Sequence, residues 1–442
     1  MHIKKIWFIK FISISFLNTS IFISSAMGTT FAKTDMQETM YISGRYLYSA
    51  AGEKVILRGI NEMMIWSNDR TGIIIYPEIA KTGANCVRIV WTREGSVSTL
   101  NQSVANCLDN KMIPIVELHD ATGVIDSVLA LVDFWTSTAM VNMIETHKKW
   151  FLLNIANEAG DNDVTETTFV NTYKMAIDKI REAGITVPLI IDAPGWGQNE
   201  TMIIKTWSEL FNHDPLKRVM FSVHTYWISN QQTRIKTLID NVVQQEIPLV
   251  FGEAPQEYGW DCESIFPWRN LIAACQENEI GWLPWSWGYV NNGNCPGKFD
   301  MTTDGVYGHW ETSWGEGIVV TDVNSIQNTS VRPPSLIDPE TTVPFAEKNK
   351  NRPVRFILHQ NHPNPFNPST VISWQLAIGS HVELSIFNVS GERVATLLSE
   401  KQLPGIYHIE WSTPVGMASG VYFYGIKTDT GLMEIKKMIY LR

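Results

Sequence analysis

The sequence is poor in charged residues and has no pattern typical of a metal site. Only 18 % of its 442 residues are charged, and the net charge is −10 with a pI of about 5.5. An acidic chain of this kind gives no reason to expect nucleic acid or an anionic membrane surface as a partner. No Cys/His spacing suggests zinc, so we expect no metal ion and no cofactor.

Cysteine is scarce as well, and its number is odd. The five cysteines are Cys86, Cys107, Cys262, Cys275 and Cys295. At least one of them is therefore unpaired or pairs outside the chain. Export would permit disulfides, but the sequence alone leaves the pairing open.

Long apolar runs are absent after the N-terminus. Residues 1–32 have the features of a secretory signal peptide, with Lys4, Lys5 and Lys10 ahead of an apolar run over 11–23. A membrane anchor is the alternative, but the run is shorter than the ~20 residues that a span requires. We therefore expect a secreted protein with no transmembrane segment in the mature chain.

What the sequence does contain, over residues 33–325, is a repeated alternation of short apolar runs and segments with helical periodicity. Eight β–α units of this length predict an α/β fold, the (β/α)₈ TIM barrel. A doubly wound open sheet is the alternative, but no glycine-rich phosphate loop follows the first run. The expected strands begin near Val55, Cys86, Met112, Trp150, Pro188, Val219, Pro248 and Ile280.

The pattern changes twice near the C-terminus. Residues 326–357 carry five prolines among polar residues and are predicted to form an extended linker. Residues 358–442 alternate with a period of two between turn residues, which predicts a small all-β sandwich of the immunoglobulin-like type. No cluster of titratable residues in it suggests catalysis.

Two glutamates are the strongest functional signal. Glu158 and Glu253 each end an apolar run of strand length. Catalytic groups of a barrel of this kind lie at the carboxyl ends of its strands, so the two carboxylates are expected to face one another. Glycoside hydrolysis needs such a pair, with one carboxyl protonated and the other ionised.

Other polar and aromatic residues fall at the ends of the expected strands. Arg88 is the cation expected beside the ionised carboxylate, and Tyr226 could donate a hydrogen bond to the same group. Asn157 could bind a sugar 2-hydroxyl. Taken singly, an arginine in a strand is more often part of a buried ion pair, and a histidine after a strand is usually structural. The prediction rests on the joint pattern of Arg88, His119, Asn157, Trp196, His224, Tyr226, Trp285 and Trp287.

These residues resemble glycoside hydrolase family 5, and most closely its bacterial endo-β-1,4-mannanase branch. The resemblance covers about 45–325. The segments that match the family's motifs are residues 57–61, 84–90, 116–123, 157–158, 192–198, 221–226, 252–253 and 281–287. It implies a retaining mechanism with Glu158 as acid/base, Glu253 as nucleophile and a carboxyl separation of ~5–5.5 Å. It also implies that Trp287, rather than Trp285, is the sugar platform. The chain departs from the family pattern at 62–66, 159–161 and 254–255, which bears on substrate preference more than on reaction type.

The tail resembles the C-terminal sorting domain of type IX secretion substrates. The segments that match are residues 361–370, 420–424 and 436–442, which cover both ends of the domain. The resemblance implies that the type IX machinery is a partner and that the protein is released or attached at the cell surface. An ordinary accessory sandwich that binds sugar is the alternative.

The sequence therefore predicts a secreted endo-β-1,4-mannanase whose substrate is β-mannan. An endo-β-1,4-glucanase of the same fold is the first alternative, because glucose and mannose differ only at C2. A surface glycan-binding protein without catalysis is the second.

Overall fold

A computed structural model of the chain describes residues 37–258, 261–290, 295, 297–338, 357–376, 380–402, 405–414, 416–428 and 433–441. The predicted signal peptide, residues 1–32, lies outside these ranges.

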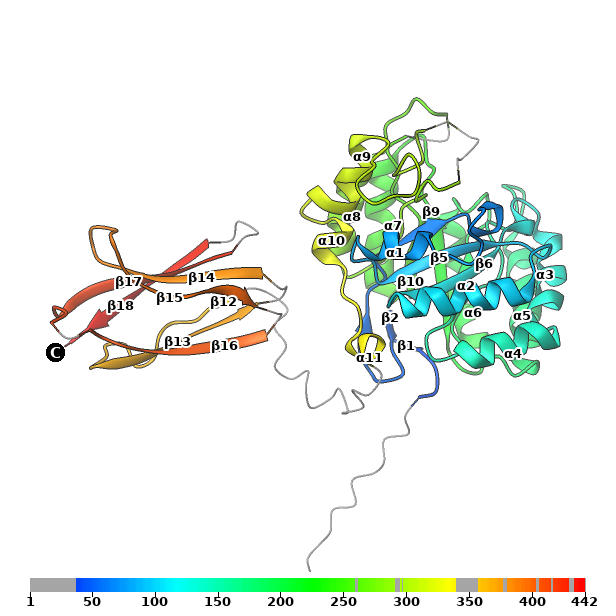
Figure 1. The fold of residues 1–442 in the computed structure, drawn as a ribbon. Coiled ribbons are helices and arrows are strands. Elements are labelled where there is room, and N and C mark those ends of the chain that lie inside the picture. Colours follow the sequence, from blue (N-terminus) through cyan, green and yellow to red (C-terminus); the bar gives the residue numbers. More distant parts are fainter. Residues whose placement is uncertain are drawn as a thin grey trace, which may run out of the picture. The chain divides into compact units, whose positions relative to one another are not determined.

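Eight parallel strands form the barrel, which confirms the predicted fold class (Figure 1). Trp282 N donates to Leu57 O, and Arg58 pairs with Trp282, so the last strand meets the segment that precedes the first. Buried β-branched and aromatic residues dominate these strands, as expected where both faces are covered. In spatial order the strands are β4 (Gly59–Glu62), β5 (Cys86–Trp91), β6 (Ile113–Leu118), β7 (Leu152–Asn154), β8 (Leu189–Asp192), β9 (Val219–His224), β10 (Leu249–Glu253) and β11 (Gly281–Trp282).

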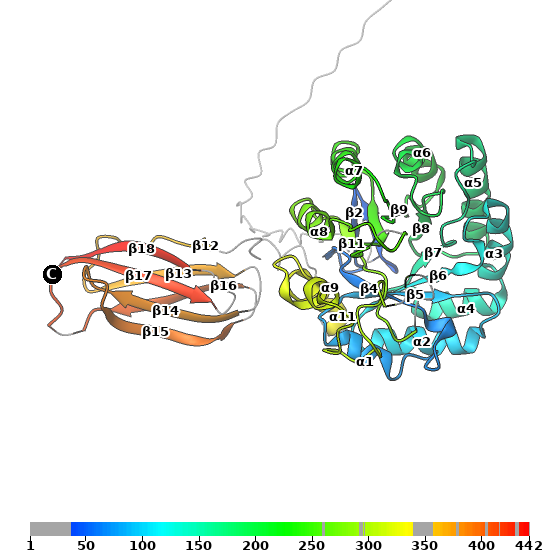
Figure 2. The ribbon, with the colours of Figure 1, turned by 90° about the horizontal axis from the view of Figure 1, so that it is seen from above.

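Helices surround the strands in a ring (Figure 2). The longest illustrates why they form: Phe169, Tyr173, Ile177 and Ile180 lie on one buried face of α5, as their spacing predicts. Thr165 caps the N-terminus of α5 by accepting from Thr168 N. The helices are α1 (Ile75–Ala80), α2 (Val97–Asp109), α3 (Val128–Trp135), α4 (Thr138–His147), α5 (Glu166–Glu182), α6 (Glu200–His213), α7 (Gln231–Gln245) and α8 (Trp268–Glu277).

A small antiparallel sheet packs against the amino ends of the barrel strands. It consists of β1 (Tyr41–Ser43), β2 (Tyr46–Tyr48) and β3 (Lys54–Val55). Its apolar residues Leu47 and Val55 share one buried cluster with residues that point inward from the strands. This end of the barrel is therefore closed by packing, and the opposite end is left for a site.

The described part of the predicted linker differs from the expectation. Residues 326–338 contain α10 (Ile326–Thr329) and α11 (Pro334–Ile337), after α9 (Ser313–Glu316). Arg332 donates to the carbonyl oxygens of Ala84 and Ala80 at 2.9 Å, and Leu336 is buried with the small sheet. Proline here starts a short helix, where its missing N–H is tolerated, so proline content alone was a poor indicator. Residues 339–356 lie outside the described ranges.

The C-terminal strands form two antiparallel sheets, as predicted for a β-sandwich (Figure 1). Trp374 of one sheet and Leu384 and Ile426 of the other are buried in one apolar cluster. One sheet consists of β12 (Ile357–Leu358), β13 (Ser369–Leu376) and β16 (Gly405–Ser412). The other consists, in spatial order, of β15 (Arg393–Gln402), β14 (Ser380–Phe387), β17 (Gly420–Thr428) and β18 (Met433–Tyr440).

Among the described helices, none is by itself long and apolar enough to cross a membrane. One bent pair, residues 125–135 with 138–147, passes that test of length and composition jointly.

Candidate active site

A cavity of about 660 Å³ opens at the carboxyl ends of the barrel strands. Both glutamates that the sequence singled out lie in its wall, together with four of the predicted aromatic and histidine residues. The lining residues are Met63, Trp66, His119, Thr122, Glu158, Trp196, Gln198, Tyr226, Glu253 and Trp285.

Glu158 and Glu253 lie close together at the bottom of this cavity. One carboxylate oxygen of each, and one ring nitrogen of His224, all lie within 4.8 Å of one another. Both glutamates are buried, with 8 % and 4 % of their surface exposed. Glu158 adopts a left-handed backbone conformation (φ 46°), which is costly for a residue with a side chain and is found mainly at functional sites.

Glu253 is held by a cation and a hydroxyl. Nη1 of Arg88 donates to its Oε1 at 2.8 Å, and the Tyr226 hydroxyl donates to its Oε2 at 2.6 Å. Arg88 is itself buried and held by Asn157 (2.7 Å) and Asn154 (2.9 Å). Burial raises the pKa of Glu253, but Arg88, His119 and the Tyr226 hydroxyl each act to lower it.

Glu158 lies in a different electrostatic environment. Burial raises its pKa well above the ordinary value, and the negative charges of Glu253 and Asp192 add to this effect. Its Oε1 lies 2.7 Å from Nδ1 of His224, whose own pKa is held well below the usual range by burial and by Arg88. A neutral His224 does not lower the pKa of Glu158 as a cation would. Glu253 therefore loses its proton before Glu158, as an acid and nucleophile pair requires.

His119 is a second titratable group with a raised pKa at the cavity. Burial alone would lower its pKa, but the Glu117 carboxylate at 2.9 Å raises it above the ordinary value. The His119 ring stacks with Trp285 at 6.1 Å and meets the edge of Trp66 at 5.5 Å. The Trp66, His119 and Trp285 rings thus form an aromatic wall at one end of the cavity.

The two tryptophans after β11, of which the family resemblance favoured Trp287 as the sugar platform, have different positions. Trp285 lines the cavity. Trp287 is fully buried, and its Nε1 donates to Gly305 O at 2.7 Å. Trp285 therefore lies at the cavity and Trp287 does not, and which of them contacts a sugar stays a prediction.

Several charged and amide groups beneath the cavity were not among the predicted site residues. Asp192 lies 3.4 Å from Nη2 of Arg88 and accepts from the backbone N–H of Glu158 at 3.2 Å. Glu117 contacts His119, and Asn154 contacts Arg88. The sequence signal that could have pointed to these residues is a polar residue inside an apolar run. Such a residue is costly to bury without a partner, so its presence indicates a buried polar contact.

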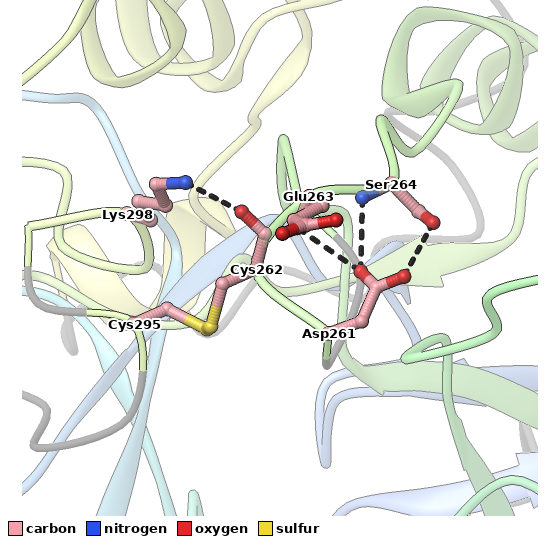
Figure 3. Close-up of a disulfide and its surroundings, with 6 residues drawn as sticks. All are labelled: Asp261, Cys262, Glu263, Ser264, Cys295 and Lys298. Carbon is pink, nitrogen blue, oxygen red and sulfur yellow. Dashed lines mark hydrogen bonds between the residues drawn. A yellow bond between two sulfur atoms is a disulfide. The ribbon is translucent and has the colours of Figure 1, made fainter.

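A disulfide joins two loops beside the cavity (Figure 3). It links Cys262 to Cys295 across 33 residues, and Nζ of Lys298 donates to Cys262 O at 2.5 Å. Cys295 packs in a small cluster with Tyr226 and Trp285. Cys86, Cys107 and Cys275 are unpaired and buried.

The spacing of Glu158, His224 and Glu253 would also permit a metal ion, judged by distance alone. These atoms already bond to one another and to Arg88, so a buried guanidinium supplies the positive charge that an ion would bring. The arrangement fits a proton donor beside an anionic nucleophile. The expectation that no metal is needed stays a prediction.

Comparison with known proteins agrees with this geometry. Residues 48–291 match the family model described as cellulase (glycosyl hydrolase family 5), and residues 361–440 match a secretion system C-terminal sorting domain. The chain is 34 % identical over 300 residues to a mannan endo-1,4-β-mannosidase of Salipaludibacillus agaradhaerens, covering 66 % of this chain and 93 % of that protein. It is 31 % identical over 320 residues to a mannan endo-1,4-β-mannosidase of Cellvibrio japonicus, covering 69 % and 71 %. A β-mannanase of Thermomonospora fusca, solved with mannohexaose, superposes with a TM-score of 0.59 at 25 % identity, covering 66 % of this chain and 98 % of that one.

Proposed function

The chain belongs to glycosyl hydrolase family 5, and on that premise we propose that it is an endo-β-1,4-mannanase that acts outside the cell or at its surface. The observation that carries the proposal is the pair of buried carboxyls, Glu158 and Glu253, within 4.8 Å at the mouth of the barrel. Mannan as the substrate is supported by the two curated relatives, each named as a mannan endo-1,4-β-mannosidase.

Glu253 is the proposed nucleophile. Its carboxylate attacks the anomeric carbon of the sugar while Glu158 gives its proton to the glycosidic oxygen, so the C–O bond breaks and the leaving chain departs neutral. Arg88 and Tyr226 hold both oxygens of Glu253, which fixes its orientation before attack. The product of this step is a covalent glycosyl-enzyme.

The second step returns both residues to their starting state. Glu158, now ionised, takes a proton from a water molecule, and the resulting hydroxide oxygen attacks the anomeric carbon. The bond to Glu253 breaks, and Glu253 leaves as a carboxylate. Glu158 is protonated again, and the anomeric configuration of the sugar is retained.

The spacing of the carboxyls supports retention. Retaining enzymes place the two groups ~5–5.5 Å apart, whereas inverting enzymes leave ~6.5–9.5 Å for a water molecule. Here one carboxylate oxygen of each glutamate lies within 4.8 Å of the other, which is nearer to the spacing of a retaining pair than to that of an inverting pair.

The aromatic wall provides a surface on which a sugar ring can pack. Trp285 presents its ring to the cavity, and the apolar face of a pyranose can pack on such a surface. Asn157 Oδ1 accepts from Arg88, and its Nδ2 donates to Thr122 Oγ1 at 2.9 Å. The amide therefore serves first to orient Arg88, and the second N–H of its Nδ2 is the donor that could serve a sugar 2-hydroxyl.

The decisive test measures reducing-sugar release by the mature chain from a soluble mannan and from a soluble β-glucan, with Glu253→Ala as control. We expect release from mannan that this variant abolishes. Activity on glucan alone would favour an endoglucanase with the same mechanism. A folded protein that binds mannan and hydrolyses neither polymer would contradict the hydrolase proposal and favour a glycan-binding role.

A second variant separates the two glutamates. Glu158→Gln should lower turnover of mannan by about 10²–10⁴-fold, because the leaving oxygen receives no proton. Release of 2,4-dinitrophenol from its β-mannobioside needs no such proton, so the first step with that substrate should stay fast. Proton NMR of the first product from the wild-type enzyme should show the β-anomer.

A further inference from the structure

Glu117 is a buried carboxylate that takes no part in the two steps of hydrolysis. It lies near the end of β6, and none of its surface is exposed. Among the described residues its side chain makes one hydrogen bond, between Oε1 and Nδ1 of His119 at 2.9 Å, and its Oε2 makes none. A carboxylate with so few partners is costly to bury, so its presence beneath the cavity indicates a role that depends on His119.

Arg88 does not account for this carboxylate. Oε1 of Glu117 lies 4.0 Å from Nη1 of Arg88, which is beyond hydrogen-bond distance. The guanidinium already donates to Glu253 at 2.8 Å and to the side chains of Asn157 and Asn154 at 2.7 and 2.9 Å. Glu117 and Arg88 therefore attract one another through space, whereas the directional contact of Glu117 is with the imidazole of His119.

The spacing of Glu117 and His119 brings their side chains to the same side of the strand. They are two residues apart, and Leu118 between them is extended (φ −107°, ψ 117°). Alternation along the strand therefore places both side chains on the inner side of the barrel. The bond to Glu117 turns the Nδ1 edge of the His119 ring toward the buried carboxylate. The opposite edge, which carries Nε2, is left to face the cavity that His119 lines.

Nε2 is the polar atom that His119 can offer to a ligand. It has no hydrogen-bond partner among the described residues. The His119 ring lies 6.1 Å from the ring of Trp285 and within 20° of parallel to it. A sugar ring packed on Trp285 would therefore have Nε2 among its neighbouring polar groups. With Nδ1–H bonded to Glu117, a neutral His119 accepts at Nε2, whereas a protonated His119 donates there.

The charged groups around His119 decide between these two forms. They are Glu117 on β6, Glu253 on β10 and Arg88 on β5. Burial lowers the pKa of His119 and Glu117 raises it, while Glu253 adds to the effect of Glu117 and Arg88 opposes it. The net result is a pKa above the ordinary value for histidine. Below that pH Nε2 carries a proton, and a hydrogen bond from a charged donor is stronger than one from a neutral group.

We propose that Glu117 is a positioning residue that holds His119 through Nδ1, so that Nε2 is presented as a charged donor to a hydroxyl of the sugar beside Trp285. The proposal rests on the proposed function. Glu117 does not line the cavity, so it touches no substrate itself. It should therefore affect the binding of mannan, through the charge of His119, more than the chemical step.

The test replaces Glu117 by glutamine in the full mature chain. Glu117→Gln keeps an oxygen that can accept from Nδ1–H and removes the negative charge, so the pKa of His119 should fall. An NMR titration of the His119 ring measures this pKa and needs no substrate. In the wild-type enzyme, KM for mannohexaose should rise about tenfold as the pH passes this pKa, because a charged donor is replaced by a neutral acceptor. In Glu117→Gln the same rise should occur at lower pH.

A second variant shows whether Glu117 acts through His119. His119→Phe keeps a ring beside Trp285 and removes the titration, so KM should be raised at low pH and should no longer rise through this range. Adding Glu117→Gln to His119→Phe should then change KM no further. Asp120→Asn is the matched control, because Asp120 follows His119 in the chain and lies 3.6 Å from Arg93. Its removal should leave the wild-type profile of KM against pH.

The conservative variant Glu117→Asp keeps the charge with a shorter reach, and should give a pKa of His119 between those of wild type and Glu117→Gln. An unshifted His119 titration in Glu117→Gln would overturn the positioning role. So would an equal effect of Glu117→Gln on KM with and without the His119 ring. A shifted titration with an unmoved profile of KM would overturn the bond from Nε2 to the sugar. A shifted titration in an enzyme inactive on mannan would instead overturn the proposed function, so the two failures are distinguishable.

Discussion

Nδ1 of His224 lies 2.7 Å from Oε1 of Glu158. The other nitrogen of the same ring faces Oδ2 of Asp192 at 3.6 Å, so a carboxylate, an imidazole and the proposed acid lie in sequence. Asp192 also accepts from the backbone N–H of Glu158 and lies beside Arg88. It does not line the cavity, so we infer that Asp192 is a positioning residue that acts on Glu158 through this backbone hydrogen bond and through its charge.

The first prediction concerns Asp192→Asn. The charged and titratable groups around Glu158 are Glu253, Asp192, Arg88, Glu117 and His224, and the negative charge of Asp192 raises the pKa of Glu158. Its removal should lower that pKa, so Glu158 loses its catalytic proton at a lower pH. The basic limb of the plot of kcat/KM against pH should move to lower pH, with kcat/KM itself reduced about 10–100-fold by misplacement. A reduced rate with an unmoved basic limb would leave Asp192 a purely structural role.

The second prediction separates Trp285 from Trp287. Trp285→Ala removes a ring from the cavity wall and should raise KM for mannohexaose about tenfold or more, since burial of an aromatic face contributes about 1.5–3 kcal/mol. Trp287→Phe removes the donor to Gly305 O and should lower the free energy of unfolding by about 1–3 kcal/mol, with KM unchanged. Steady-state kinetics and urea unfolding of both variants give the comparison. The opposite result would restore Trp287 as the platform.

The same two residues show where sequence reasoning reached its limit. Strand alternation places Trp285 and Trp287 on one side, but β11 ends at Trp282, so alternation no longer applies beyond it. Glu158 and Glu253 were singled out because each closes an apolar run, although only Glu253 ends a strand and Glu158 lies in the turn after β7. The roles of the Asp192 and Glu117 carboxylates were not identifiable, because both face Arg88, which lies on β5, and only the closed barrel brings these strands' side chains together. Proline content likewise could not reveal that residues 326–338 pack on the barrel.

The third prediction concerns the disulfide. Cys262–Cys295 closes a 33-residue separation and packs beside Tyr226, which holds the proposed nucleophile. Replacing both cysteines by serine should lower the free energy of unfolding by about 2–4 kcal/mol, mainly because the unfolded chain gains freedom. We also expect a lower kcat, because the support behind Tyr226 is loosened.

A reducing agent supplies the control for this prediction. It should lower the Tm of the wild-type enzyme and leave that of the double variant unchanged, because Cys86, Cys107 and Cys275 form no disulfide. An equal effect on both proteins would show that the reductant acts elsewhere.

The fourth prediction concerns the pH dependence of stability. Glu62 ends β4 and is fully buried, with no side-chain donor within hydrogen-bond distance among the described residues. Burial, with a smaller contribution from the charge of Asp300, raises the pKa of Glu62 to about 8. An unfolded glutamate releases its proton near pH ~4.3. Between these two pH values the folded state holds one more proton than the unfolded state, so the free energy of unfolding falls as pH rises through this window and levels off above it.

Glu62→Gln keeps the size of the side chain and removes this titration. The free energy of unfolding of the variant, taken relative to wild type, should therefore increase from pH 5 to pH 8, by at most about 1.4 kcal/mol for each pH unit. Urea unfolding at several pH values gives the two curves, and Glu182→Gln on the exposed face of α5 serves as the matched control. Parallel curves for wild type and Glu62→Gln would mean that Glu62 titrates alike in both states. A difference between variant and wild type that grows from pH 5 to pH 8 would identify Glu62 as a buried acid that stays protonated near neutral pH.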